Sequence, residues 1–329
     1  MKSLVVDQLG SLDDLRVQET ESPQLHDGQI RVKVAACGLN FVDSLMIEGR
    51  YQIKPAVPFV PGSEITGRVV ETGPGVDDAM NGRRVFVPVG AGGFSDEVIA
   101  MANRVLPIPD ELTDGQGATF MQSYLTAWFA FTRRTQVEAG KTMLVLGAGG
   151  GVGLAAVDVG VALGLKVIAG ASTAEKRQLG LDRGAFASVD VINDDVKAKV
   201  REISGGVDIV YDPVGGALAE AGLRALRDDG QLLVLGFAGG EIPKLPANQI
   251  LLRNRRVTGV DWGGWVGGHQ KENAAMLAEV SIRIGRYRAR SAPLGKNGCI
   301  ALSTRQISNS SCSKSSRFRL KRWKGEFTR

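Results

Sequence analysis

The stretch Leu144–Leu154, LVLGAGGGVGL, decides the fold, because it joins an apolar strand to an Ala/Val-rich helix through a glycine-rich turn. Such a turn lets backbone N–H groups approach a pyrophosphate, and the helix N-terminus adds positive partial charge. Ala148, Gly150 and Gly153 fill the G-x-G-x-x-G spacing, with alanine in the first place. A merely flexible glycine-rich loop is the alternative, and the strand–turn–helix frame argues against it. The residues expected to contact the phosphates are Gly147, Ala148, Gly150, Gly151, Val152 and Gly153.

Downstream of this motif, apolar runs alternate with helical segments. KVIAG (166–170), GVDIVYDPVGG (206–216) and GQLLVLGFAGG (230–240) have the pattern of buried strands, and LAEAGLRALRDD (218–229) that of a helix. Continuous apolar strands separated by helices indicate a parallel sheet covered on both faces. Residues 124–262 are therefore predicted to form a doubly wound Rossmann domain of the α/β class.

Upstream, short β-rich runs are separated by Gly and Pro. QIRVKVAACGL (29–39), EITGRVVETG (64–73), RRVFVPVG (83–90) and FSDEVIA (94–100) predict antiparallel strands of a small barrel-like domain. This first domain is placed at 1–123, and a helical link at 112–135 leads into the second. Residues 263–280 are expected to return toward the first domain, and 281–329 to form an atypical tail.

Bulk composition is that of an ordinary globular protein. The 329 residues are 43% hydrophobic and 23% charged, which leaves room for about two domain cores. No signal peptide and no run of eighteen apolar residues occurs, so a soluble, cytoplasmic chain with no membrane partner is expected. The three cysteines are too scattered for a disulfide framework or a CxxC metal site: Cys37, Cys299 and Cys312.

The net charge of +5 comes from the tail. From Ser281 onward, 13 Lys and Arg residues face the single acid Glu326, and the preceding body is acidic. No nucleic-acid groove is therefore expected in the body. The abrupt change to basic, Ser-rich sequence has two explanations: a shifted reading frame in the source sequence, which we favour, or a genuine extension that binds nucleic acid or an acidic partner.

The end of the strand after the glycine-rich turn indicates which dinucleotide binds. An NAD site normally places Asp or Glu there for the ribose hydroxyls. This chain reads ASTAEKR from Ala171 to Arg177, without a carboxylate at the strand end. Ser172 offers a hydrogen bond, and Lys176 or Arg177 a charge for a 2′-phosphate. NADPH is therefore the expected cofactor. Alternatively, Lys176 and Arg177 belong to the solvent-exposed face of a helix and do not contact the cofactor.

Five motifs together resemble the medium-chain dehydrogenase/reductase superfamily, nearest to its NADPH:quinone oxidoreductases: CGLNFVD (37–43), PGSEITG (61–67), YLTAW (124–128), the glycine-rich turn, and YDPVGG (211–216). The resemblance implies a GroES-like first domain and a Rossmann second domain. It also implies that Asn40 and Thr126 lie near the nicotinamide, and that Gly236 and Phe237 line the cofactor. Zinc-dependent relatives carry Cys at the position of Asn40 and His at that of Ser63, so no metal is expected.

Without a metal to polarise a carbonyl, acceptors that take hydride into a conjugated system are expected: quinones, enones or enoyl thioesters. The resemblance places Tyr51 where related enoyl reductases carry a proposed proton donor, although Tyr51 has an equal interpretation as a packing residue. The expected partners are a small hydrophobic acceptor and a second copy of the chain, as a homodimer. The alternative function is an idle relative that binds NADPH and uses its basic tail to bind RNA or a protein.

Overall fold

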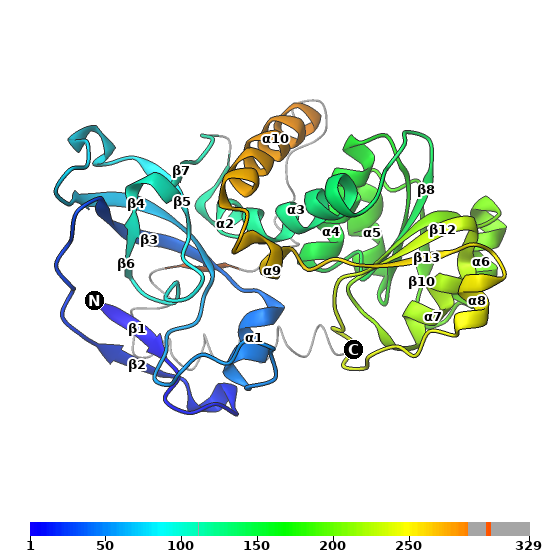
Figure 1. The fold of residues 1–329 in the computed structure, drawn as a ribbon, viewed down its shortest axis with the longest axis horizontal. Helices are drawn as coiled ribbons and strands as arrows, with labels where there is room; N and C mark the ends of the chain where they lie inside the picture. The colour runs from blue at the N-terminus through cyan, green and yellow to red at the C-terminus, as the bar shows by residue number, and fades with distance from the viewer. Residues whose placement is uncertain (111, 289–300, 304–329) are drawn as a thin grey trace. The chain divides into compact units, whose positions relative to one another are not determined.

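The computed structural model describes residues 1–110, 112–288 and 301–303 (Figure 1). These residues form two compact units that divide between Met121 and Gln122, with residues 301–303 belonging to the first. Apart from residues 281–288 and 301–303, the predicted tail, including both explanations for its composition, lies outside the described residues. None of the described helices combines the length and apolar character that crossing a bilayer requires.

Unit 1 is β-rich, as predicted. Its main sheet has the order β14-β3-β4-β5-β7, with β6 also paired to β3, and all its pairings are antiparallel. A separate two-stranded sheet pairs β1 with β2. The strands are β1 (Lys2–Val5), β2 (Arg16–Glu19), β3 (Gln29–Gly38), β4 (Glu64–Thr72), β5 (Arg84–Pro88), β6 (Glu97–Met101), β7 (Leu106–Pro107) and β14 (Ala301–Ser303). The helices are α1 (Phe41–Ile47), α2 (Asp114–Gly117) and short 3₁₀ turns at Leu12–Asp14, Asp78–Met80 and Ala102–Arg104.

Unit 2 contains a parallel sheet in the order β10-β9-β8-β11-β12-β13, which is the Rossmann order. Its strands are β8 (Thr142–Leu146), β9 (Lys166–Ala171), β10 (Ala187–Asp190), β11 (Val207–Asp212), β12 (Leu226–Val234) and β13 (Arg256–Gly259). The helices are α3 (Phe120–Phe129, which starts in unit 1), a π-helix (Ala130–Arg134), α4 (Gly151–Ala162), α5 (Ala174–Asp182), α6 (Val196–Ser204), α7 (Gly216–Ala225), α8 (Ala247–Leu251), α9 (Trp262–Val266) and α10 (Gln270–Arg288).

Helices cover both faces of this sheet (Figure 1). α4 packs on α5 and α10, while α6 packs on α7 and α7 on α8. One apolar core joins the strands to α6 and α7, with fully buried side chains at Leu144, Val200, Val210, Leu223 and Leu232. Burial from both sides explains the apolar runs in the central strands, such as TMLVL of β8. The carboxyl ends of β8, β9, β11 and β12 therefore form one edge of a rigid scaffold.

One boundary differs from the sequence prediction. The helix expected over 218–229 ends at Ala225, and β12 starts at Leu226, because Leu226 takes an extended conformation with φ −61° and ψ 143°. Within the residues assigned to the tail, α10 continues to Arg288 and Ala301–Ser303 pairs with the end of β3. Pairing of this kind rests on backbone hydrogen bonds, so apolar periodicity does not reveal it.

Candidate functional site

The glycine-rich turn leaves β8 and enters α4 with little room for side chains. Gly147 has a φ of +64°, in the left-handed region that favours glycine. A Cβ on Gly153 would lie 2.1 Å from the carbonyl oxygen of Gly147, so only glycine allows the helix to start this close to the strand. The first N–H groups of α4, from Gly151 to Gly153, lack intrahelical partners by geometry and are suited to an anion.

The end of β9 brings the predicted ribose-binding residues beside this turn. The N–H of Ala148 donates to the carbonyl of Gly170 at 3.0 Å, and Ser172 follows the strand as a half-buried residue. Lys176 lies in the first turn of α5, and its stem covers Gly149, where a Cβ would be 2.5 Å from the Lys176 Cβ. The turn, Ser172 and Lys176 therefore lie together.

Arg177 has a different role from its neighbour Lys176. Its guanidinium lies 2.8 Å from Asp190 at the end of β10, and it also donates to the carbonyl of Ala171 at 3.3 Å. Asp190 in addition accepts hydrogen bonds from Asn193 and Ile192, and these hold its pKa below the ordinary value. Arg177 thus pairs with a carboxylate on the strand next to β9, whereas the stem of Lys176 lies against Gly149 of the phosphate-binding turn.

Gly236 and Phe237 follow β12 and lie against the loop that follows β11. The N–H of Leu235 donates to the carbonyl of Asp212, and that of Ala238 to the carbonyl of Pro213. The ring of Phe237 lies over Gly215, where a Cβ would be 2.9 Å from it. Phe237 is 37% exposed, so part of the residue is open to solvent after the carboxyl end of β12.

Asp212 ends β11 beneath this loop, fully buried. Its Oδ1 accepts from the N–H groups of Val214 and Gly215 at 2.8 and 2.9 Å, while its Oδ2 has no hydrogen-bond partner among the described residues. Burial raises the pKa of this carboxyl. The side chain acts locally, because it fixes the loop against which Phe237 packs.

Thr126 is the remaining predicted cofactor residue of unit 2. It lies on α3, half-buried, and its hydroxyl donates to the carbonyl of Gln122 at 2.6 Å. The hydroxyl proton is thus used within the helix, while the oxygen can still accept a hydrogen bond.

In unit 1, Asn40 caps the start of α1 and meets two residues from the start of β4. Its amide nitrogen donates to Glu64 at 3.0 Å and lies 3.5 Å from the hydroxyl of Ser63. Glu64 is 3% exposed. Asn40 and Ser63 stand where zinc-dependent relatives carry Cys and His. Their amide and hydroxyl groups are therefore adjacent in space, beside the buried carboxylate of Glu64.

Asp43 holds this cluster together. Its two oxygens accept from the N–H of Asn40 at 2.8 Å and from the N–H of Gly62 at 3.3 Å. The carboxyl is 1% exposed, and burial raises its pKa from 3.8 to about 7, against the lowering effect of these two hydrogen bonds. Cys37 is buried nearby, and burial raises the pKa of its thiol well above the usual range.

Asp43 is expected to make folding stability depend on pH between about 4 and 7. Because its pKa rises to about 7 in the folded chain, the folded state keeps a proton that the unfolded state has lost. The free energy of unfolding should fall as pH rises through this window, by up to about 4 kcal/mol, and level off above it. Urea unfolding at pH 5, 6, 7 and 8 measures this slope. Asp43→Asn should flatten it, and equal slopes in both proteins would contradict the assignment.

Tyr51 lies beyond the other end of α1. Its N–H donates to the carbonyl of Leu45 at 3.1 Å, after Gly49 turns the chain with a φ of 68°. The residue is half-buried. A seven-residue helix is about 10 Å long, so the backbones of Asn40 and Tyr51 lie at opposite ends of one short element.

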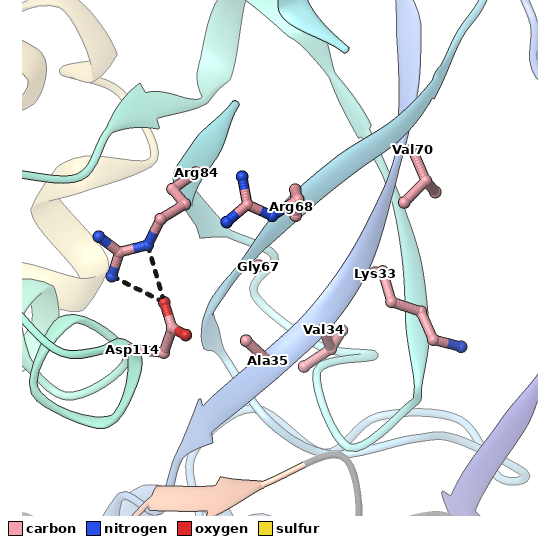
Figure 2. Close-up of a pocket in the computed structure, with 8 residues that line it drawn as sticks. All are labelled: Lys33, Val34, Ala35, Gly67, Arg68, Val70, Arg84 and Asp114. Atoms are coloured by element: carbon pink, nitrogen blue, oxygen red, sulfur yellow. Dashed lines mark hydrogen bonds and ion pairs between the residues drawn. The ribbon is translucent and has the colours of Figure 1, made fainter. Parts of the chain in front are cut away.

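A separate hollow of about 310 Å³ lies over the middle of β3 and β4 (Figure 2). Its charged side chains already have partners: Lys33 lies 3.3 Å from Asp96 and from Glu97, and Arg84 lies 2.9 Å from Asp114. None of the predicted site residues lines it. We assign no function to this hollow, which is lined by Lys33, Val34, Ala35, Gly67, Arg68, Val70, Arg84 and Asp114.

Sequence reasoning missed two residues that organise these sites. Asp43 was quoted within a motif but given no role, although its spacing of three residues from Asn40 is that of an N-terminal cap partner. Asp190 gave no signal, because its closeness to Arg177 depends on the parallel register that sets Asp190 beside Ala171.

Comparison with known families agrees with this geometry. Residues 26–110 match the family model described as the alcohol dehydrogenase GroES-like domain, and residues 151–281 match the zinc-binding dehydrogenase model. The two matches fall on the antiparallel sheet of unit 1 and on the Rossmann sheet of unit 2. The second model is named for zinc, although Asn40 and Ser63 stand at the expected ligand positions.

Similar proteins and solved structures indicate the branch of the family to which the chain belongs. The chain is 39% identical to quinone oxidoreductase-like protein 2 of Bos taurus over 76% of this chain and 72% of that one. A probable oxidoreductase from Mycobacterium abscessus superposes with a TM-score of 0.74 at 33% identity, covering 88% of both chains. The quinone oxidoreductase of Thermus thermophilus, also solved in complex with NADPH, superposes with a TM-score of 0.75 at 29% sequence identity. The match covers 92% of this chain and all of that one. The protein therefore belongs to the medium-chain dehydrogenase/reductase superfamily, in its quinone oxidoreductase-like branch.

Proposed function

We propose that the protein is an NADPH-dependent oxidoreductase that reduces a quinone or an activated alkene. The observation that carries this proposal is the carboxyl edge of β8 and β9, where the α4 N-terminus, Ser172 and Lys176 lie together with no free carboxylate at the strand end. Relatives named quinone oxidoreductases, one of them solved with NADPH, support it.

When bound, NADPH would supply the hydride, and the residues of this chain bind and orient it. The first turn of α4 is suited to the pyrophosphate, and the partly exposed Phe237 follows β12 at the same sheet edge. On unit 1, the Asn40 amide is fixed by Glu64 and its backbone by Asp43, so it can present one orientation to a ligand. We infer that Asn40 and Thr126 contact the nicotinamide end, as their positions in the motifs imply.

Lys176 is expected to make the protein prefer NADPH to NADH. A 2′-phosphate gains a charge-assisted hydrogen bond from Lys176 that a 2′-hydroxyl cannot match. Lys176→Ala should weaken NADPH binding about tenfold or more and leave NADH binding nearly unchanged, since such a bond is worth about 1.5–3 kcal/mol. Dissociation constants from fluorescence titration with both dinucleotides measure this.

Lys199→Ala provides the control for the Lys176 experiment. Lys199 is also half-exposed on a helix of unit 2, where it pairs with Glu202 at 2.9 Å, so its loss removes the same charge from the same unit. Both dinucleotides should bind this variant as they bind the wild type. Equal weakening of NADPH and NADH by Lys176→Ala would contradict the assigned role.

We also propose that the reaction needs no metal. At the positions of the missing thiolate and imidazole stand an amide, whose nitrogen already donates to Glu64, and a neutral hydroxyl. Neither is a ligand that zinc prefers. Acceptors whose product is stabilised by conjugation need no Lewis acid, which favours quinones, enones and enoyl thioesters over simple alcohols or carbonyls.

We propose further that the chain forms a homodimer through unit 2. β13 is an edge strand of the described Rossmann sheet. Val257 on this strand is 39% exposed, and Leu251 and Leu252, shortly before it in the sequence, are 76% and 74% exposed. An edge strand with exposed apolar side chains invites pairing with another chain. Sedimentation equilibrium should give twice the chain mass, and Val257→Lys should shift it toward the monomer; a monomeric wild type would contradict this proposal.

A further inference from the structure

Three elements of unit 2 meet at one buried carboxylate, that of Asp158 in the middle of α4. The hydroxyl of Tyr124 on α3 donates to its Oδ2, and the guanidinium of Arg183, at the end of α5, donates to the same oxygen at 2.8 Å. Asp158 is 1% exposed and Tyr124 7%, while the Arg183 side chain is 15% exposed. The contact is thus an interior one.

Asp158 is the one ionisable side chain of α4, whose sequence GVGLAAVDVGVA is otherwise apolar. Burying an ion pair costs desolvation that its Coulomb attraction barely offsets, and an apolar residue of similar volume would often be as stable. Stability alone is therefore a poor reason for a carboxylate at this position, whereas a fixed geometry among the three elements is a sufficient one.

Each of the three elements carries a different part of the proposed cofactor site. α3 carries Thr126, which is two residues after Tyr124 and hence about 200° around the helix, so anchoring Tyr124 sets the direction of Thr126. α4 begins with the phosphate-binding turn. α5 carries Lys176 in its first turn and ends at Asp182, with Arg183 as its C-cap.

We propose that Asp158 is a positioning residue that sets Thr126 and Lys176 relative to the phosphate-binding turn, through Tyr124 and Arg183 respectively. This inference rests on the proposed NADPH-dependent function. The two connections are separate, so they have separable effects: the Tyr124 connection governs the nicotinamide end, and the Arg183 connection governs the ribose-phosphate end.

Two single variants test the separation. Tyr124→Phe keeps the ring and should lower kcat at saturating NADPH about tenfold, with the ratio of NADPH to NADH affinity unchanged, because small misplacements of reacting groups are costly. Arg183→Leu should lower that affinity ratio about threefold or more while kcat changes less than twofold. Arg183→Lys, which can still reach the carboxylate, should restore the ratio.

A readout without cofactor accompanies these measurements. In the free protein, Tyr124→Phe should accelerate amide hydrogen exchange over residues 120–129 (α3) but not over residues 174–182 (α5). Arg183→Leu should accelerate exchange over residues 174–182 but not over residues 120–129. Arg227→Leu is the matched control. It breaks an ion pair of 2.9 Å between Arg227 and Asp208, near the amino ends of β12 and β11, so it should lower stability and leave kcat and the affinity ratio unchanged.

The outcomes separate the two proposals. If the wild type binds no NADPH, the proposed function fails and this inference falls with it. If the wild type binds and turns over NADPH, yet Tyr124→Phe and Arg183→Leu only lower stability as Arg227→Leu does, the contact is merely structural and the positioning role is wrong. A lower kcat in Tyr124→Phe, together with a lower ratio of NADPH to NADH affinity in Arg183→Leu, would support the positioning role of Asp158.

Discussion

Gly153→Ala is expected to weaken NADPH binding about a hundredfold, the scale at which a displacement of about 1 Å disrupts a prepared site. The new Cβ would lie 2.1 Å from the oxygen and 2.7 Å from the carbon of the Gly147 carbonyl, and 3.0 Å from the Cα of Ala148. All three are backbone atoms, so either the turn or the start of α4 must move. Calorimetric titration with NADPH measures the loss.

Gly160→Ala is the control, since it makes the same substitution in the same helix. The atom nearest to its Cβ is the end of the Met143 side chain, at 2.5 Å, which can rotate away at small cost. NADPH affinity should stay within about twofold of the wild type, because the phosphate-binding turn is untouched. If Gly153→Ala binds NADPH as well as Gly160→Ala does, the turn is not the pyrophosphate site.

Tyr51→Phe should lower alkene reduction about a hundredfold and leave quinone reduction within a few-fold. An alkene needs a proton delivered to the substrate after the hydride arrives, whereas a reduced quinone is a stabilised anion that water can protonate. The variant keeps the ring and removes only the hydroxyl, so NADPH affinity should not change. Steady-state rates with one quinone and one enone, at saturating NADPH, provide the comparison.

Tyr51→Leu separates donation from packing, because it removes the ring as well as the hydroxyl. If Tyr51 is a proton donor, Tyr51→Phe and Tyr51→Leu should lose alkene reduction to a similar extent. Should Tyr51→Phe lower both activities together with cofactor affinity, Tyr51 is a packing residue and the proton-donor role must be abandoned.

The sequence predicted the strands that are buried on both faces, because such strands contain apolar runs that can be recognised in the sequence. β8, β11 and the second half of β12 contain apolar runs because helices cover both faces of the sheet. The predicted strands of unit 1 coincide with β3–β6 to within a few residues. β10 escaped prediction because AFASVD lacks such a run. A short edge strand packs fewer apolar side chains, so its sequence carries less signal.

Parts of the candidate site depend on tertiary closeness and could not be predicted. Arg177 and Lys176 are equivalent as neighbouring cations in the sequence, and only the register of β10 against β9 occupies Arg177 with Asp190. Asp158 likewise reads as one polar residue in an apolar helix. Its partners Tyr124 and Arg183 are 34 and 25 residues away, and no local pattern connects them.

NADPH oxidation by the purified 329-residue chain, after exhaustive treatment with a chelator, tests the central claim most directly. Absorbance at 340 nm would be followed with a quinone, with an enone and without acceptor. We expect acceptor-dependent, saturable oxidation that the chelator leaves unchanged, with NADPH preferred to NADH. Absence of NADPH oxidation with every acceptor, or activity lost on chelation and restored by zinc, would contradict the account.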